Sequence, residues 1–215
     1  MTFPLKLMAA LCLPLWACGG NAGKTEAVAD SLKQCTAPNA VVETILTRRS
    51  VRKYLPQAVE RAKMERIVEC GLYTPNAMNK QPWEVRIVDS PEFINGVTEL
   101  FKQANPQQAA DPGFKNMFRN APTVVFVGRD TTSATAAFDC GLLSENMMLA
   151  AWSMGIGSCC LGGPAHFMRS PEAADYLRRL AFSEGYELLY CIAFGYPDEA
   201  PSAKPRDTSK VKFVE

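Results

Sequence analysis

The stretch from Ala136 to Met154, AAFDCGLLSENMMLAAWSM, constrains the fold more than any other part of the chain. Its length suits a helix, and apolar residues lie almost all round that helix rather than on one face. Such a helix has too little polar surface to face water. The pattern therefore predicts a central helix, and it predicts a two-fold homodimer built on this helix.

Shorter periodic segments surround this stretch. Apolar residues at helical spacing predict helices over Val41–Thr47, Val59–Leu72, Pro91–Gln103 and Glu172–Arg179. Alternating or continuous apolar residues predict strands over Glu84–Val88, Thr123–Gly128 and Leu188–Phe194. Residues 105–116 indicate a loop. The segments follow no strict βαβ rhythm, and neither a GxGxxG nor a GxxxxGK motif occurs, so nothing supports a Rossmann or P-loop nucleotide site.

The charge balance gives no support for nucleic acid or an acidic membrane as a partner. The chain has 215 residues and a formal net charge of +1, so it has no overall attraction to nucleic acid or to an acidic membrane. Its length suits one domain with an appendage.

The N-terminus has the pattern of an export signal. Lys6 precedes an apolar run over Leu7–Trp16 that is too short to span a bilayer. The run ends in LWAC, which resembles a bacterial lipobox and implies cleavage before Cys18 and lipid on its sulfur. The alternative is a buried N-terminal helix, which Pro4 and Pro14 fit poorly. We expect a lipoprotein-type signal peptide over residues 1–17, the lipidated cysteine and a tether over 18–38, and the folded domain over 39–215.

Positive charge is concentrated just after the first predicted helix. Arg48, Arg49 and Arg52 surround Ser50 in the stretch RRSVRKY. Such an excess in a nearly neutral chain needs a local anion or water. The arginines also suit the negative end of the preceding helix dipole, which is the alternative reading.

A second polar stretch, TPNAMNKQPW, covers residues 74–83 between a helix and a strand. Asn76, Asn79 and Gln81 each offer a donor and an acceptor, which suits the edge of a heterocycle. The alternative is a simple polar turn in which Pro82 holds Gln81 extended.

Two later stretches also suit a ligand, the first through its glycines and the second through its cations. In GIGSCCLGG, residues 155–163, Gly155 ends the long helix, and Gly162 and Gly163 permit close approach of backbone N–H groups to a ligand. The alternative is a tight turn from helix to strand. In FGYPDEAPSAKPR, residues 194–206, a buried strand leads to Lys204 and Arg206, which otherwise belong to a solvated tail.

The eight cysteines do not define a metal site, because no CxxC pair occurs and His166 is the only histidine. Cys159 and Cys160 are adjacent, and a bridge between them would need a strained ring, so two small core residues are the simpler interpretation. Export would allow pairing among the others, which the sequence does not specify.

Taken in this order and spacing, the four polar and glycine-rich stretches resemble the nitroreductase-like flavoprotein family over about residues 41–206. The resemblance implies an α+β fold with a mainly antiparallel sheet wrapped by helices. It also implies an interlocked homodimer that binds FMN at the subunit interface.

The resemblance assigns the candidate FMN contacts. It implies phosphate and ribityl contacts from Arg48, Ser50, Lys204 and Arg206, with Arg49 beside them contributing its backbone and Arg52 at the pyrimidine side of the ring. It places Pro75, Asn76, Ala77 and Asn79 along the pyrimidine edge. It assigns Cys160, Leu161, Gly162 and Gly163 to the partner subunit, with a backbone N–H near the two glycines donating to flavin N5.

The implied reaction passes hydride from NAD(P)H or another donor through flavin N5 to a nitroaromatic, a quinone or a similar acceptor. The flavin supplies the chemistry, so no side chain is nominated as a general acid or base, and no metal is expected. The lipobox implies a bacterial cell-envelope location, lipid-anchored to the membrane, where soluble NAD(P)H is scarce. The alternative is therefore an extracytoplasmic lipoprotein that holds or relays FMN without turnover of its own.

Overall fold

The computed structural model describes residues 39–215, so the predicted signal peptide, Cys18 and tether lie outside the described residues. Its helices are α2 (Ala40–Thr47), α3 (Arg61–Leu72), α4 (Pro91–Ala104), α5 (Pro106–Ala109), α6 (Ala136–Ser153), α7 (Gly162–Met168) and α8 (Ala174–Arg179). Its strands are β1 (Trp83–Val88), β2 (Thr123–Asp130), β3 (Gly157–Leu161) and β4 (Tyr186–Gly195). Short 3-10 helices are η1 (Ala77–Asn79), η2 (Pro171–Ala173) and η3 (Thr208–Lys210). Within residues 39–215, no helix combines the length and apolar character needed to cross a membrane.

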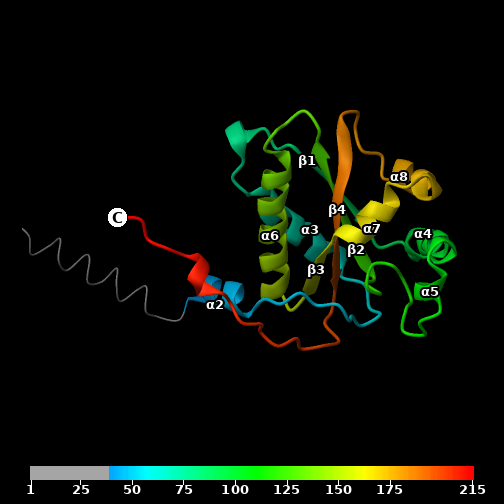
Figure 1. Ribbon diagram of the computed structural model, residues 1–215, viewed down its shortest axis with the longest axis horizontal. Helices are drawn as coiled ribbons and strands as arrows, with labels where there is room; N and C mark the ends of the chain where they lie inside the picture. The colour runs from blue at the N-terminus through cyan, green and yellow to red at the C-terminus, as the bar shows by residue number, and fades with distance from the viewer. Residues whose placement is uncertain (1–38) are drawn as a thin grey trace, which may run out of the picture. The chain divides into compact units, whose positions relative to one another are not determined.

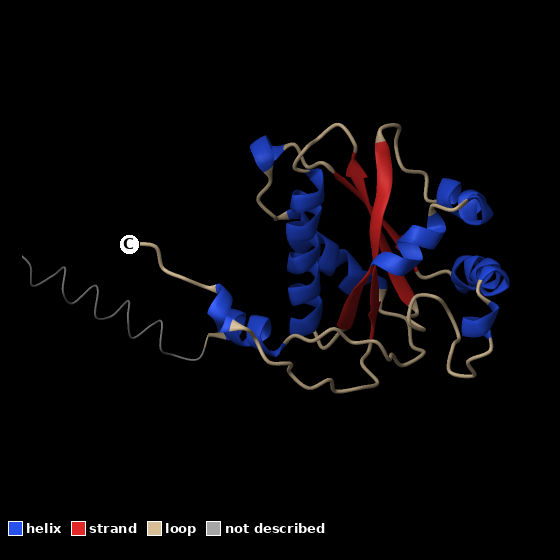
Figure 2. Cartoon of the chain, viewed as in Figure 1, coloured by secondary structure: helices blue, strands red, loops and turns tan. Residues whose placement is uncertain are grey.

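The four strands form one antiparallel sheet in the order β1-β2-β4-β3. Helices cover both of its faces, with α3 and α6 on one side and α4, α7 and α8 on the other (Figures 1 and 2). This arrangement confirms the predicted α+β fold with a mainly antiparallel sheet.

The position of β2 inside the sheet explains why its sequence, TVVFVG, is apolar almost without a break. Val124 and Phe126 point into the core under α4 and α7, whereas Val125 and Val127 point into the core under α6. Successive side chains of a strand point to opposite faces, so a strand covered on both faces needs apolar residues at every position. All four side chains are fully buried.

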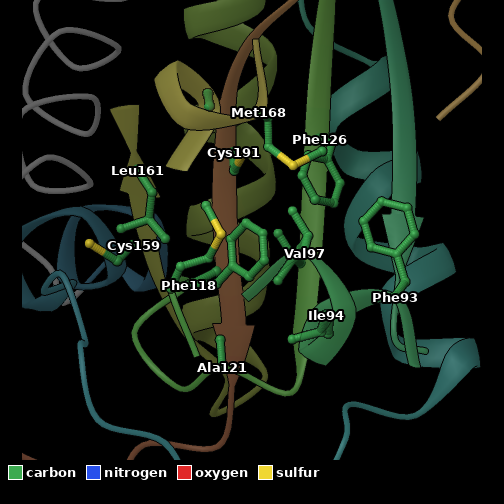
Figure 3. Close-up of a cluster of buried hydrophobic side chains, with 14 of the residues drawn as sticks. Phe93, Ile94, Val97, Phe118, Ala121, Phe126, Cys159, Leu161, Met168 and Cys191 are labelled. Atoms are coloured by element: carbon green, nitrogen blue, oxygen red, sulfur yellow. The ribbon is translucent and has the colours of Figure 1, made fainter. Parts of the chain in front are cut away.

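The core beneath α4 and α7 is built around aromatic rings (Figure 3). Phe126 of the sheet meets Phe118 edge to face at 5.6 Å between ring centroids and meets Phe93 of α4 at 5.9 Å. Ser90 starts α4 by accepting a hydrogen bond from the Phe93 N–H, and Pro91 takes the first helical position. The helix predicted there from Pro91 is confirmed.

The core beneath α6 depends on close contact with α3. A Cβ on Gly71 of α3 would lie 2.5 Å from Met147 Cγ of α6, so the two helices can approach this closely only with glycine there. Eight of the 18 residues of α6 are buried, on the side that packs against α3 and the sheet, which confirms its predicted central place, but Phe138 near its start stays 67% exposed. Part of its apolar surface is therefore uncovered in one chain. Gly155, with φ +73°, follows the helix, as its role as a stop predicts.

Two regions differ from the sequence-based expectation. Residues 157–161 form strand β3 and residues 162–168 form α7, where the glycine pattern indicated a turn. The strand exists because β4 pairs along its whole length, which is a long-range contact. Residues 106–109, predicted as loop, form the single turn α5.

Candidate functional site

The cation-rich segment after α2 is fastened to the edge of the sheet. Val51 N donates to Ser158 O of β3 at 3.0 Å, and Ser50 forms a parallel bridge with Ser158. The Val51 side chain is fully buried, and a Cβ on Gly157 would lie 2.9 Å from its Cβ. This packing fixes the backbone that carries Arg48 to Arg52 at the β3 edge.

Tyr54 anchors the far end of the same segment. Its hydroxyl donates to the Val51 carbonyl oxygen, and its ring covers Gly195 at the end of β4. The side chain is 8% exposed, and burial raises the pKa of the Tyr54 hydroxyl well above its usual range. The segment is thus held by one buried aromatic ring and one buried valine.

The C-terminal tail leaves the sheet beside this segment. Leu55 N donates to Tyr196 O, and Asp198 N donates to Lys53 O, both at 2.9 Å. The carboxylate of Glu199 accepts from the Arg52 N–H at 2.5 Å. Lys204 and Arg206 follow in exposed chain.

A small polar cluster fixes the point where the tail begins. Tyr196 donates its hydroxyl to Glu60 Oε2 at 2.5 Å and accepts from Lys63 Nζ at 2.7 Å. The hydrogen bond from Tyr196 lowers the pKa of the Glu60 carboxyl, and the same hydroxyl raises the pKa of Lys63. The tail therefore starts from a defined place at the edge where the cations lie.

Most of the candidate cations lack a carboxylate partner. Arg48 forms an ion pair with Glu145 of α6, at 3.2 Å between Nε and Oε1. Within the described part of the chain, the side chains of Arg49, Arg52, Lys204 and Arg206 form no ion pair. The Arg49 and Arg52 guanidinium groups donate to nearby backbone carbonyls instead. This edge therefore carries positive charge that suits an anion such as a phosphate.

The amide-rich loop before β1 is tightly wound. Asn76 Oδ1 accepts from Gln81 N at 2.8 Å, and Asn76 Nδ2 donates to Thr74 O at 3.2 Å. Met78, Asn79 and Gln81 have φ angles of 53°, 54° and 48°. The expectation that Pro82 holds Gln81 extended is therefore wrong, because the Asn76 hydrogen bond turns the backbone there. The loop leaves Asn79 exposed and able to meet a ligand or a partner.

The strand register places the end of this loop far from the Ser50 bridge of the same chain. The Ser50 bridge is level with Thr123 of β2, whereas the loop enters β1 at Trp83, level with Arg129. The two points lie six residues apart along β2 and four strand spacings apart across the sheet. At about 3.4 Å per residue and about 4.8 Å per strand, they are separated by roughly 28 Å. In one chain the register therefore keeps the Trp83 end of the loop far from the Ser50 bridge, whereas Thr74 at the start of the loop contacts Asn146 of α6, the neighbour of the Glu145 that pairs with Arg48.

The glycine and cysteine stretch lies beside the cations in the same chain. Cys159 is buried and Cys160 is exposed, since they point to opposite faces of β3. They form no disulfide, and the other described cysteines, Cys70, Cys140 and Cys191, are also free. Gly162 and Gly163 open α7, and a Cβ at either position would meet nothing within 4 Å. The surface there is open to a ligand.

Two polar residues of α6 belong to this arrangement and were not predicted. Glu145 holds Arg48, and Asn146 Nδ2 donates to Thr74 Oγ1 at 2.8 Å at the entry to the amide-rich loop. A signal was present in the sequence, because Glu145 and Asn146 place two polar side chains in the middle of a mostly apolar helix. A polar pair inside such a helix needs partners.

A family model and several known proteins match most of the chain. The model of the nitroreductase family matches residues 45–196. An NADPH-flavin oxidoreductase of Vibrio harveyi is 31% identical, and the match covers 78% of this chain and 70% of that protein. A nitroreductase from Bacteroides fragilis, solved with bound FMN, is 28% identical with a TM-score of 0.72, covering 83% of this chain and 100% of that one. A nitroreductase from Desulfitobacterium hafniense, also solved with bound FMN, is 26% identical with the same TM-score and the same coverage.

Proposed function

Because the chain belongs to the nitroreductase family, we propose that it is an FMN-dependent oxidoreductase that passes hydride from NAD(P)H to a nitroaromatic, a quinone or a similar acceptor. The observation that carries this proposal is the cation segment fastened to the β3 edge, in which the side chains of Arg49 and Arg52 form no ion pair within the described residues. These cations suit the phosphate of FMN, which carries about two negative charges at neutral pH.

The residues of this edge fit the two ends of the cofactor. Arg48 and Ser50 would hold the phosphate together with Lys204 and Arg206 of the tail. Arg52 would place its charge at the pyrimidine side of the ring, where it favours the anionic reduced form. When bound, FMN supplies the redox chemistry, and the chain supplies position and charge.

We infer that each site combines two chains. The roughly 28 Å between the Ser50 bridge and Trp83, where the amide-rich loop enters β1, exceeds the length of one FMN molecule. The Ser50 bridge and β3 lie side by side in one chain, so the cations and the stretch from Cys160 to Gly163 would serve the same flavin. The loop with Asn76 and Asn79 would come from the partner subunit, which reverses the division that the family resemblance suggested.

The exposed apolar surface supports a two-fold homodimer. Helix α2 buries none of its residues in a single chain, and Ile45 and Leu46 are 52% and 63% exposed. Phe138 on α6 and Phe213 in the tail are 67% and 96% exposed. Monomeric soluble proteins rarely expose so many large apolar groups, whereas a second copy would cover them.

We also propose a location in the bacterial cell envelope. The apolar run that ends in LWAC before Cys18 supports a lipid anchor there. Stable anchoring needs more than one acyl chain, which a lipid-modified N-terminal cysteine supplies.

The proposed function is tested by flavin binding and reduction. The purified protein should bind FMN and turn yellow, and NADH or NADPH should bleach the flavin absorbance. Arg48→Ala and Arg206→Ala should each weaken FMN binding by about 1.5–3 kcal/mol, because each removes a charged hydrogen bond.

Arg129→Ala is the matched control, because Arg129 pairs with Glu187 on β4 and takes no part in the proposed site. Unchanged FMN affinity in both site variants would remove the cations from the site. A yellow protein that neither nucleotide bleaches would favour a different donor or a flavin carrier without turnover.

A further inference from the structure

Glu145 places a carboxylate in the middle of α6, and this carboxylate meets Arg48. Its Oε1 lies 3.2 Å from Arg48 Nε and its Oε2 lies 3.4 Å from Arg48 Nη2. The contact joins residues 97 positions apart in the sequence. It therefore ties the cation segment after α2 to α6, the longest helix among residues 39–215.

The contact uses one edge of the guanidinium and leaves another free. A guanidinium has five N–H donors in a rigid plane. The carboxylate occupies the edge formed by Nε and Nη2. Within the described residues, Nη1 of Arg48 donates to no other group. Nη1 and the outer N–H of Nη2 form a second edge that can bind a phosphate through two parallel hydrogen bonds.

We propose that Glu145 is a positioning residue that holds the free edge of Arg48 toward the phosphate of FMN. This inference rests on the proposed function. Arg48 would otherwise lose the rotational freedom of a long side chain when the phosphate binds, and Glu145 removes part of that freedom beforehand. The edge proposed for the phosphate is adjacent to the edge that Glu145 occupies and shares Nη2 with it, so the positive guanidinium lies between the two anions and offsets their repulsion.

An ordinary stabilising ion pair would behave differently. The side chains of Arg48 and Glu145 are 21% and 43% exposed, and pairs this exposed contribute little to stability. If Glu145 only supported the fold, its loss would affect every ligand of the site alike. If it positions Arg48, its loss should affect only ligands that carry a phosphate. Riboflavin, which is FMN without the phosphate, separates the two cases.

The experiment measures the dissociation constants of FMN and riboflavin for the apoprotein by flavin fluorescence. Glu145→Ala should raise the FMN constant about two- to fivefold and leave the riboflavin constant unchanged, in keeping with the size of exposed ion-pair effects. Glu145→Gln keeps one acceptor oxygen, so it should show a smaller loss, and it serves if the alanine variant does not fold. Once Arg48→Ala is present, adding Glu145→Ala should cause no further loss. Glu187→Ala, which breaks the ion pair with Arg129, is the matched control and should change neither constant.

Three results would overturn the proposal. They are an unchanged FMN constant in Glu145→Ala, tighter FMN binding, and an equal loss for both flavins. The proposed function fails separately if the wild-type protein binds no flavin.

Discussion

Tyr54→Phe removes a single hydroxyl that ties the cation segment to the core. This hydroxyl donates to the Val51 carbonyl oxygen, and the Tyr54 side chain is 8% exposed. The variant leaves the Val51 carbonyl without this partner, and an unsatisfied buried acceptor costs about 1–3 kcal/mol. We expect the free energy of unfolding at pH 8 to fall by that amount.

The same substitution should change how stability responds to alkaline pH. Burial raises the pKa of Tyr54 in the folded protein above its usual value of 10.0. The unfolded chain ionises first, so the stabilisation is present below pH 10 and is lost as the pH rises above it. At pH 11 the unfolded wild type gains about 1.4 kcal/mol from ionising this tyrosine. Phenylalanine cannot ionise, so the stability gap between wild type and variant should shrink by about 1.4 kcal/mol from pH 8 to pH 11.

Urea denaturation followed by circular dichroism, at one protein concentration and at both pH values, measures this gap. Tyr73→Phe is the control, because Tyr73 is 82% exposed. The free energy of unfolding of this control should differ little from that of the wild type at either pH. A gap for Tyr54→Phe that stays constant from pH 8 to pH 11 would refute the reasoning, since it would mean that Tyr54 titrates alike in the folded and unfolded states.

Two further predictions concern the amide-rich loop and the N-terminus. Asn146→Ala removes the hydrogen bond to Thr74, which is 4% exposed, and should lower the free energy of unfolding in urea by about 1–2 kcal/mol. Cys18→Ser should move the protein from the membrane fraction to the soluble fraction, because the acceptor of the lipid is gone. Recovery of an intact Met1 peptide by mass spectrometry, with a soluble wild-type pool, would contradict the predicted anchor.

Long, strongly patterned segments of this fold were predictable from the sequence. The run from Thr123 to Gly128 reads as a strand because its residues are buried on both faces of the sheet. The stretch beginning at Ala136 predicts a central helix because its own apolar residues lie on almost every side of that helix. In both cases local sequence and tertiary environment favour the same structure, so the pattern alone is sufficient.

Strand β3 shows why other parts were not predictable. Its sequence, GSCCL, is short, and glycine alone suggests a turn. Gly157 is required for another reason, because Val51 packs where its Cβ would be. The strand forms through β4 and the Ser50 bridge, which are contacts between segments distant in the sequence. The ion pair of Arg48 with Glu145 also depends on such a contact, so the sequence could indicate the cation but not its partner.

The strand order links cofactor binding to assembly. Strands β2 and β4 occupy the middle of the sheet, so the cation segment beside β3 and the loop before β1 lie at opposite edges. We propose that a flavin held at the cations contacts the loop of a second chain. The apolar side chains left uncovered on α2 and α6 give a second chain a surface to bury. A ligand that contacts both chains binds the dimer in preference to the monomer, so FMN and dimerisation should each strengthen the other.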